Sequence, residues 1–502
     1  MSYDSLYFSQ LSNSFGGDEA IGLSEFDMFG KSNELIHADM NSITTVVQEA
    51  SVQQSTTKTM YQFNIPDVNN FYNYGRSYFL IQGWITDSSD ARLSGVTGVG
   101  GVRNIHAQFR QATLQVDGVK VEDIMNYEYT SEIKTKVQFS QSGERYLSQE
   151  GIYVDNGSCS GQDPRDATSG ALIPQRNAAQ FKRYQRASLD STWIGSDYDA
   201  IDTAGLFTSK CVTFRIPVWR VFDSLRAYDK LMKGHLLNIT FIRTSNRTMP
   251  VLIGPTANGT AASADTYQFV INKFQLYLNL VEPPPPVKAT LMSGLSANER
   301  SISRFDLWYA TQNIGASTIG TGAGSAIFTC VTPGPRIEKA YVVMLPTAPT
   351  SGYSSINPFA LLNANKGSLL NWETAQLTVN SIMTNLQPFN MYSGSNTQAP
   401  SAFDSSTVGG DFTQMYAQYC LCAGRDNIIK DGPLLSYDDF VQQQFFAFDC
   451  SQLPEPLTAA GAILNFRITW SACAQALVPW IVLQCRQVME IVGVSQPILR
   501  NI

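Results

Sequence analysis

The chain has 502 residues, of which only 15% are charged and 11% are aromatic. Residues 1–50 hold eight acids and one base and so account for the whole formal net charge of −7, while the rest of the chain has 34 residues of each sign. This balance excludes a basic field over the whole molecule of the kind that binds nucleic acid. The length favours two domains of roughly 200 residues, and the low charge favours broad protein–protein contacts.

Residues 1–55 are predicted to form an acidic N-terminal arm, because they lack the alternation of a strand and carry one helical apolar stripe. The stripe consists of Leu35, Ile36, Met40, Ile43, Val46 and Val47. We expect it to be buried against a neighbouring copy or a minor protein rather than against the arm's own domain. The opening MSYDSLYFSQ predicts no signal peptide, and no apolar stretch reaches the ~20 residues of a membrane span.

Residues 56–282 are predicted to form an antiparallel β domain. In YFLIQGWIT, Phe79, Ile81 and Ile85 recur with the period of a strand. Asp117 and Gly118 stand between two alternating runs in TLQVDGVKV, which is the strongest hairpin signal in the sequence. A polar, Gly-rich stretch at about 140–206 is too long for a simple connection and is predicted to be a surface insertion.

The stretch 216–244 predicts a helix followed by a strand. An apolar stripe at helical spacing consists of Val221, Phe222, Leu225 and Tyr228. Arg220, Asp223 and Arg226 fall off this stripe, so we expect the stripe to be buried and Arg226 to be exposed. Gly234 is expected to follow the end of the helix with a positive φ.

The run PPPP at 283–286 predicts a stiff, extended linker that covers residues 283–300. Residues 301–502 then repeat the style of the first half, with strand-like runs at 337–345, 462–470 and 480–492. Two strand-rich domains joined by a proline-rich boundary indicate an all-β protein built from two sandwiches or jelly rolls.

The sequence offers little for catalysis or for binding a metal or cofactor. Its three histidines, His37, His106 and His235, are scattered, and HExxH, G-x-S-x-G and complete phosphate-binding glycine motifs are absent. The eight cysteines are sparse, and Cys420 and Cys422 alone do not make a zinc site. We therefore predict free, mostly buried thiols and no catalytic, cofactor-binding or metal residues.

Two segments of the first half carry recognisable motifs. Residues 102–129 combine a His- and Phe-containing run, an Asp-Gly turn and the sequence Asn-Tyr-x-Tyr, and residues 214–246 run from a strand through a short helix and a Gly to a strand that ends in Arg. Both segments resemble the double jelly-roll major capsid proteins of polinton-like viruses and virophages. The matching residues are His106, Phe109, Asp117, Gly118, Asn126, Tyr127, Tyr129, Ile216, Pro217, Phe222, Asp229, Lys230, Gly234 and Arg243.

The resemblance implies two consecutive jelly-roll barrels with long loop insertions, a few short helices and an N-terminal arm. It also implies a structural role, without catalysis and without a cofactor, in the virion of a DNA virus. Homotrimers of pseudo-hexagonal outline would tile an icosahedral shell, assembled inside the host cell, beside penton and minor or cement proteins. Sequence-specific nucleic-acid binding is not expected, and an inner membrane is left open.

Two other functions remain as alternatives, because a β-sandwich fold does not determine function. One is carbohydrate binding, which predicts a signal peptide and disulfides. The other is hydrolysis by a β-sandwich enzyme, whose paired carboxylates cannot be located from sequence alone.

Overall fold

The computed structural model describes residues 41–54, 59–66, 69–95, 99–102, 104–154, 183, 186–189, 207–228, 230–244, 251–253, 267–297, 300–312, 319–332, 336–346, 370–384, 389–390, 412–424, 432–442, 445–454, 461–473 and 476–501.

In the described part of the first half, eight strands build two antiparallel sheets. They are β1 (Asn41–Glu49), β3 (Thr59–Ile65), β4 (Phe71–Thr86), β6 (Phe109–Val116), β7 (Val119–Met125), β8 (Val212–Pro217), β9 (Leu237–Arg243) and β11 (Gln268–Glu282). One sheet has the order β1-β11-β4-β8 and the other β3-β9-β6-β7, with β2 (Ser51–Gln54) added beside β3. The short strands β5 (Val99–Val102) and β10 (Val251–Ile253) pair separately.

The described part of the second half repeats this arrangement. Its eight strands are β12 (Arg300–Gln312), β13 (Gly324–Val331), β14 (Ile337–Pro346), β15 (Leu370–Val379), β16 (Ile382–Met383), β18 (Phe446–Asp449), β19 (Ile463–Cys473) and β20 (Leu477–Val492). The sheet orders are β12-β20-β14-β18 and β13-β19-β15-β16. Two further strands, β17 (Phe389–Asn390) and β21 (Ile498–Asn501), pair with β15 and β20.

Both halves therefore have one topology. Numbered along the chain within each half, the strands lie in the orders 1-8-3-6 and 2-7-4-5, which is the arrangement of a jelly roll with its two facing sheets. The predicted all-β fold of two consecutive jelly rolls is confirmed.

The helices lie between strands or at the ends of the sheets. They are the 3₁₀ turns η1 (Ile105–Gln108), η2 (Gln141–Gly143) and η3 (Ser148–Glu150) and the helices α3 (Tyr127–Gln138), α4 (Glu144–Leu147), α6 (Val218–Val221), α7 (Asp223–Ala227), α8 (Pro285–Ser296), α9 (Thr413–Cys422) and α10 (Tyr437–Gln442). Among the described residues, no helix combines the length and apolar character needed to cross a membrane.

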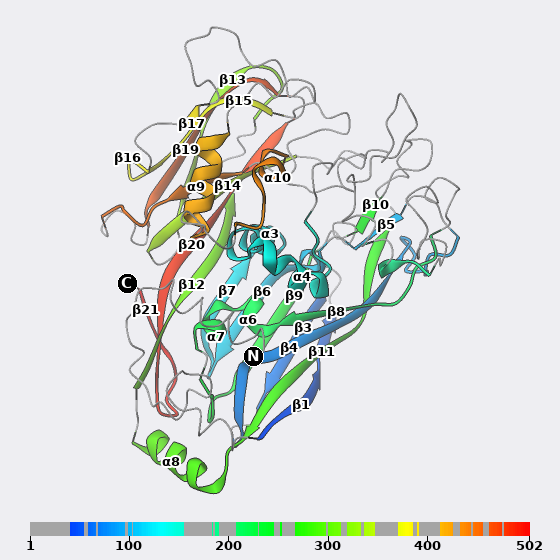
Figure 1. Cartoon of the computed structure of the whole chain (residues 1–502), viewed down its shortest axis with the longest axis vertical. Coiled ribbons are helices and arrows are strands. Elements are labelled where there is room, and N and C mark those ends of the chain that lie inside the picture. Colours follow the sequence, from blue (N-terminus) through cyan, green and yellow to red (C-terminus); the bar gives the residue numbers. More distant parts are fainter. Residues whose placement is uncertain are drawn as a thin grey trace.

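Each domain has its own apolar core, and the first core also includes residues of the second domain. Alternate residues of β9 are buried, and Phe241 of this strand lies 5.3 Å from Phe274 between ring centroids, within a cluster of aromatic side chains. Phe305 of β12 and Met489 of β20 belong to this first core, although their strands form the second domain. Figure 1 shows β12 and β20 extending from the second domain along the side of the first.

The Asp-Gly hairpin was predicted correctly. Asp117 and Gly118 connect β6 to β7 with φ values of 50° and 81°, the positive values that a two-residue hairpin turn requires. A short side chain at the first position and glycine at the second tolerate these angles.

The predicted helix between residues 35 and 47 is wrong where the structure describes it. Residues 41–49 form β1, which pairs with β11 from Asn41↔Glu282 to Glu49↔Gln275. The run ITTVV at 43–47 is rich in β-branched residues, and these favour strands over helices. Residues 41–54 thus belong to the sheets of the first domain, and the rest of the predicted arm at 1–40 lies outside the described residues.

The proline-rich boundary is also different from the prediction. It is not extended, because α8 begins at Pro285 and continues to Ser296. Proline fits the first turn of a helix, where its missing N–H has no intrahelical partner, and Ala289 and Leu291 then continue the helix. Most of the predicted insertion at about 140–206 lies outside the described residues, apart from 140–154, 183 and 186–189.

The pairing of β1 with β11 leads to a prediction about truncation. A chain that starts at Asn41 keeps β1, whereas a chain that starts at residue 55 lacks both β1 and β2. We expect the first chain to stay soluble and the second to aggregate, because β11 would then present an unpaired edge. Soluble yield and the urea midpoint, measured beside the full chain, test this. Equal midpoints for the two truncated chains would contradict it.

Candidate functional site: a buried polar network between the domains

Helix α3 lies between the two jelly rolls and contributes to both cores (Figure 1). Tyr127, at its start, is buried in the first core, whereas Ile133 and Val137 are buried in the second. Asn126, just before the helix, donates its side-chain N–H to the carbonyl oxygen of Ala310 at 3.0 Å. Tyr129 packs against Trp480 of β20 in a tilted arrangement, with 4.9 Å between ring centroids. The helix therefore sets how the two domains meet.

A chain of buried polar side chains starts at His106 in η1. Its Nδ1 lies 2.6 Å from the hydroxyl of Tyr127, and its Nε2 lies 2.9 Å from a carboxylate oxygen of Glu150. Arg220 of α6 donates from Nε to the same Glu150 oxygen at 3.3 Å and from its terminal nitrogen to Thr135 of α3. His106, Glu150 and Arg220 are at most 1% exposed. Four separate segments are joined in this way.

The network continues through Asp223 to the second domain. Lys134 of α3 lies 3.1 Å from one Asp223 oxygen and donates to the carbonyl of Val221 at 3.1 Å. The other Asp223 oxygen accepts the indole N–H of Trp308 at 2.7 Å, and Trp308 belongs to β12. Gln138 also donates to Asp223, at 3.2 Å. A single carboxylate thus links α7, α3 and the second jelly roll.

Glu122 of β7 holds the start of α7. Its two carboxylate oxygens accept the backbone N–H groups of Ser224 at 2.6 Å and Asp223 at 3.2 Å. Burial, together with the charge of Asp223, raises the pKa of Glu122 to about 7.

Burial also lowers the pKa of His106 and that of Lys134. The carboxylate of Glu150 acts to raise the pKa of His106, and the carboxylate of Asp223 acts to raise that of Lys134. Buried pairs of this kind contribute little net stability, because desolvation offsets much of their attraction, whereas removing one partner is strongly destabilising. Among the described residues, no group of three or more His, Cys, Asp or Glu side chains could hold a metal ion.

The structure brings several of the motif residues together. His106 and Tyr127 share a hydrogen bond, as given above. Phe109 and Phe222 both contact Phe241, at 4.9 and 6.2 Å between ring centroids. Arg243 is opposite Phe109 in the pairing of β6 with β9 and donates to Gln108 at 3.1 Å and to the carbonyl of Phe269.

A second group of motif residues lies at the hairpin turn. The carboxylate of Asp117 lies 2.6 Å from Nδ1 of His235 and accepts the N–H of Leu236 at 2.7 Å. The Asp117 carbonyl accepts a hydrogen bond from Gln496 of the second domain at 3.0 Å. Gly234 has a φ of +86°, and an added Cβ there would come within 2.7 Å of Val494. The predicted positive φ is confirmed, and its neighbourhood is a contact between domains.

The helix predicted within 216–244 is interrupted. Phe222 has extended backbone angles between α6 and α7, so two short helices replace one. The second ends at Ala227, and Gly234 therefore does not terminate it. The predicted stripe is nevertheless buried, with Phe222 fully covered. Asp229 lies outside the described residues, while Lys230 is buried.

Sequence reasoning missed most of the polar network. The spacing placed Arg220 and Asp223 off the apolar stripe, which ordinarily means exposure, but both are buried. Helix α3 was not predicted, so Lys134 drew no attention. The sequence did contain one signal of a buried polar partner. Trp308 lies in a strand-like run, and a buried indole N–H requires an acceptor, which is Asp223 in the structure.

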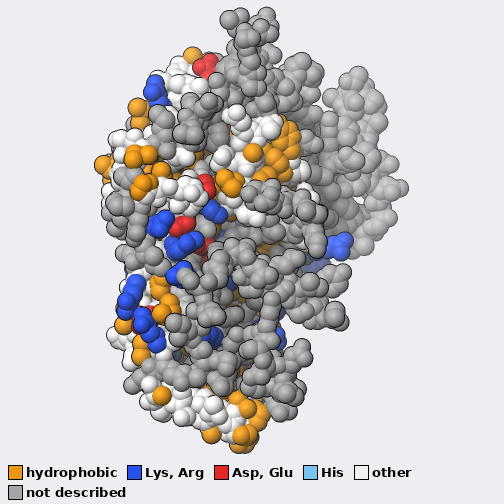
Figure 2. Space-filling view, turned by 60° about the vertical axis from the view of Figure 1, so that its left-hand side comes forward, with side chains coloured by type: hydrophobic (Ala, Val, Ile, Leu, Met, Phe, Trp, Pro, Cys, Tyr) orange, Lys and Arg blue, Asp and Glu red, His pale blue; other side chains and the backbone are white. Residues whose placement is uncertain are grey.

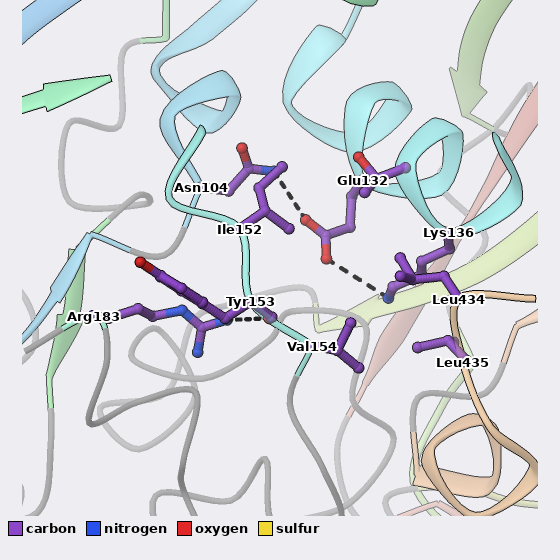
Figure 3. A pocket seen from close by; sticks show the side chains of 10 residues that line it. Asn104, Glu132, Lys136, Ile152, Tyr153, Val154, Arg183, Leu434 and Leu435 are labelled. Carbon is purple, nitrogen blue, oxygen red and sulfur yellow. Dashed lines mark hydrogen bonds and ion pairs between the residues drawn. The ribbon is translucent and has the colours of Figure 1, made fainter. Parts of the chain in front are cut away.

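A small pocket lies beside α3, between the domains (Figure 3). Asn104 donates to Glu132 at 3.1 Å, and Lys136 lies 3.7 Å from the same carboxylate. Leu434 and Leu435 of the second domain close the other side. Its volume of about 30 Å³ has room for one or two water molecules.

Replacing Gly234 tests the contact at the hairpin turn. We expect Gly234→Ala to destabilise the chain more than Gly118→Ala, which has a similar φ of +81° but no atom within 4 Å of an added Cβ. Each variant loses about 1 kcal/mol from the left-handed backbone, and only the first also meets Val494. Urea midpoints of both variants, and of Gly234→Ala with Val494→Ala, measure the difference. If adding Val494→Ala did not restore part of the urea midpoint lost in Gly234→Ala, the contact with Val494 would not be the cause of the loss.

Glu122 predicts a pH dependence of stability. Its pKa is raised from 4.5 to about 7, so its stabilising contribution is complete below pH 4.5 and is lost as pH rises through 7. Glu122→Gln removes this titration, and the melting temperature of the native chain should fall relative to that of the variant across this range.

Asp123 provides the matched control for that experiment. Although burial acts to raise the pKa of Asp123, hydrogen bonds from Lys120, Gln111 and Thr113 hold this pKa below its ordinary value. Asp123 therefore stabilises the native chain above pH 3.8, and this contribution is lost as pH falls below that value. The melting temperature of the native chain relative to that of Asp123→Asn should thus change with pH in the direction opposite to that for Glu122→Gln. Identical pH profiles for the native chain and Glu122→Gln would show that Glu122 does not titrate there.

Comparisons with known proteins find likeness at the level of structure. No protein-family model and no curated protein sequence matches the chain. A chain in the cryo-EM structure of the Sputnik virophage superposes with a TM-score of 0.53 and 11% identity, over 92% of this chain and 88% of that one. The mavirus major capsid protein superposes with a TM-score of 0.50 and 10% identity, over 97% and 96% of the two chains.

The likeness extends over nearly the whole chain and includes both jelly rolls and their order. It agrees with the strand topology derived above. The chain therefore has the double jelly-roll fold, the same fold as these virophage proteins.

Proposed function

We propose that this chain is a major capsid protein, a building block of the shell of a DNA virus. The observation that carries the proposal is the repeated strand order of two consecutive jelly rolls, in a chain that superposes over nearly its full length on the mavirus major capsid protein. The motif residues quoted from the sequence support the same family.

In this proposal three copies form a homotrimer with six jelly rolls, whose outline is pseudo-hexagonal and can touch six neighbours in a flat lattice. Such a role needs a fixed angle between the two jelly rolls, because an error within one subunit is repeated across the shell. The buried network through Asp223 and the cores shared around α3 supply that rigidity.

The proposed role depends on contact area and not on catalysis. Low charge and many aromatic residues suit broad interfaces. The pocket beside α3, at about 30 Å³, is far smaller than the ~300 Å³ or more of a typical ligand site. We propose further that trimers contact one another, penton proteins and minor or cement proteins, and that the protein resides in the virion.

The oligomeric state tests the proposal directly. Purified chain should be a homotrimer by light scattering, and it should remain so on dilution into the micromolar range. Negative-stain microscopy should show pseudo-hexagonal particles or shells.

Asp223→Asn with Lys134→Met provides a variant for the link between rigidity and assembly. It replaces the buried ion pair and leaves the exposed surfaces unchanged. We expect trimers to form and the lattice to become irregular. In the oligomeric-state test of the native chain, a stable monomer would contradict the capsid role.

A further inference from the structure

An exposed part of the sheet at β12, β20 and β21 carries a pair of arginines held by a buried carboxylate. Glu490 of β20 is bound from both sides, by Arg300 at 2.5 Å and by Arg500 at 2.8 Å. The side chain of Glu490 is only 6% exposed, whereas those of Arg300 and Arg500 are 50% and 56% exposed. The carboxylate fixes the two guanidinium groups from below and leaves their outer N–H groups toward solvent.

A second arrangement of the same kind lies farther along this sheet. Glu338 of β14 lies 3.5 Å from Arg486 and 3.6 Å from Arg336. Its side chain is 7% exposed, against 38% and 24% for the two arginines. Figure 2 shows Lys and Arg side chains gathered in two groups on this side of the molecule, with acidic groups among those of the upper one.

The pairing register puts the residues of β12, β20 and β21 on one face, and the ion pair between Arg486 and Glu338 joins the start of β14 to it. Arg304 and Asp306 of β12 are opposite Val488 and Arg486 of β20, and Val488 is in turn opposite Arg500 of β21. We call this surface the arginine face. It comprises Arg300, Arg304, Arg336, Arg486, Arg500, Glu338, Glu490 and Asp306. With five arginines and three carboxylates, it is net basic in a chain that is net acidic.

The matching negative charge lies in one segment of the same chain. Residues 1–40 hold seven acids and one base, a net charge of −6 out of the total of −7. The acids are Asp4, Asp18, Glu19, Glu25, Asp27, Glu34 and Asp39. A basic surface complements a segment of this composition, and guanidinium groups bind carboxylates in a favourable planar geometry.

The connectivity brings the segment and the arginine face to the same end of the molecule. Asn41, the first residue of β1, is opposite Glu282 of β11, and only α8 separates Glu282 from Arg300 (Figure 1). Forty residues can span far more than the length of β12. Because the segment is tethered to the same subunit, its effective concentration at the arginine face is high.

We propose that the arginine face binds the acidic N-terminal segment, residues 1–40, of the same chain. The interaction is between carboxylates of the segment and arginines that are already oriented by Glu490 and Glu338. It does not depend on the proposed capsid role, and a monomeric chain would show it as well.

Limited proteolysis of the full chain tests this with a glutamate-specific protease, whose sites in the segment are Glu19, Glu25 and Glu34. Mass spectrometry gives the cleavage rate at each site. In Arg300→Gln/Arg304→Gln/Arg500→Gln, we expect cleavage about fivefold faster than in the native chain, since several modest surface pairs are lost together. Raising the salt concentration should abolish the protection in the native chain.

A matched control removes the same amount of charge elsewhere. Lys210, Lys273 and Arg467 are exposed and lie off the arginine face. Their combined change to Gln should leave the cleavage rates unaltered. An equal acceleration in this control would mean that only overall charge matters, and the proposal would fail.

A second variant avoids any disturbance of the fold around Glu490. Asp4→Asn/Asp18→Asn/Asp27→Asn/Asp39→Asn lowers the net charge of the segment from −6 to −2 and keeps the three cleavage sites. It should accelerate cleavage to a similar extent, and combining it with the arginine changes should add little, as expected for direct partners in a double-mutant cycle. Fully additive effects would overturn the proposal.

Two further outcomes would also overturn it. Protection that falls on dilution would assign the bound segment to another copy. If the arginine variant lost affinity for a short DNA duplex while cleavage stayed unchanged, the face would be a nucleic-acid site instead.

Discussion

The carboxylate of Asp223 is the point on which the relation between the two jelly rolls depends. It binds Lys134 of α3 and the indole of Trp308 in β12, while its own backbone N–H is held by Glu122 of β7. Each of these partners comes from a different element. A buried charge in this position is costly unless every partner is in place, so the network permits one arrangement of the domains and penalises others.

The shared cores strengthen this constraint without replacing it. Apolar contacts between α3 and the second domain are not directional, and they would tolerate small rotations. Hydrogen bonds to Asp223 and the Asp117–Gln496 contact are directional, and they select one rotation. In the proposed capsid role, in which one subunit repeats many times in a lattice, this distinction would matter more than the total free energy of unfolding.

Much of the fold could be predicted from local pattern, and little of the buried network could. The Asp117-Gly118 turn and the buried Phe222 follow from turn chemistry and periodicity, which short segments carry by themselves. The strand at 41–49 was mistaken for a helix, since a register shift between Thr44 and Val46 breaks the alternation of a strand and only the pairing with β11 reveals it. Arg220 and Asp223 are buried because α3 and β12 cover them, and that depends on contacts across more than 80 residues.

The sharing of the first core with β12 and β20 has a consequence for the order of biosynthesis. Met489 and Ile491 of β20 belong to the first core, yet they are synthesised long after β11, the last strand of the first jelly roll. The first jelly roll therefore cannot complete its core until β20 has been made, and until then part of its apolar surface stays uncovered. A chain broken off before β20 would lack part of both cores, and we expect such a chain to be degraded by proteases.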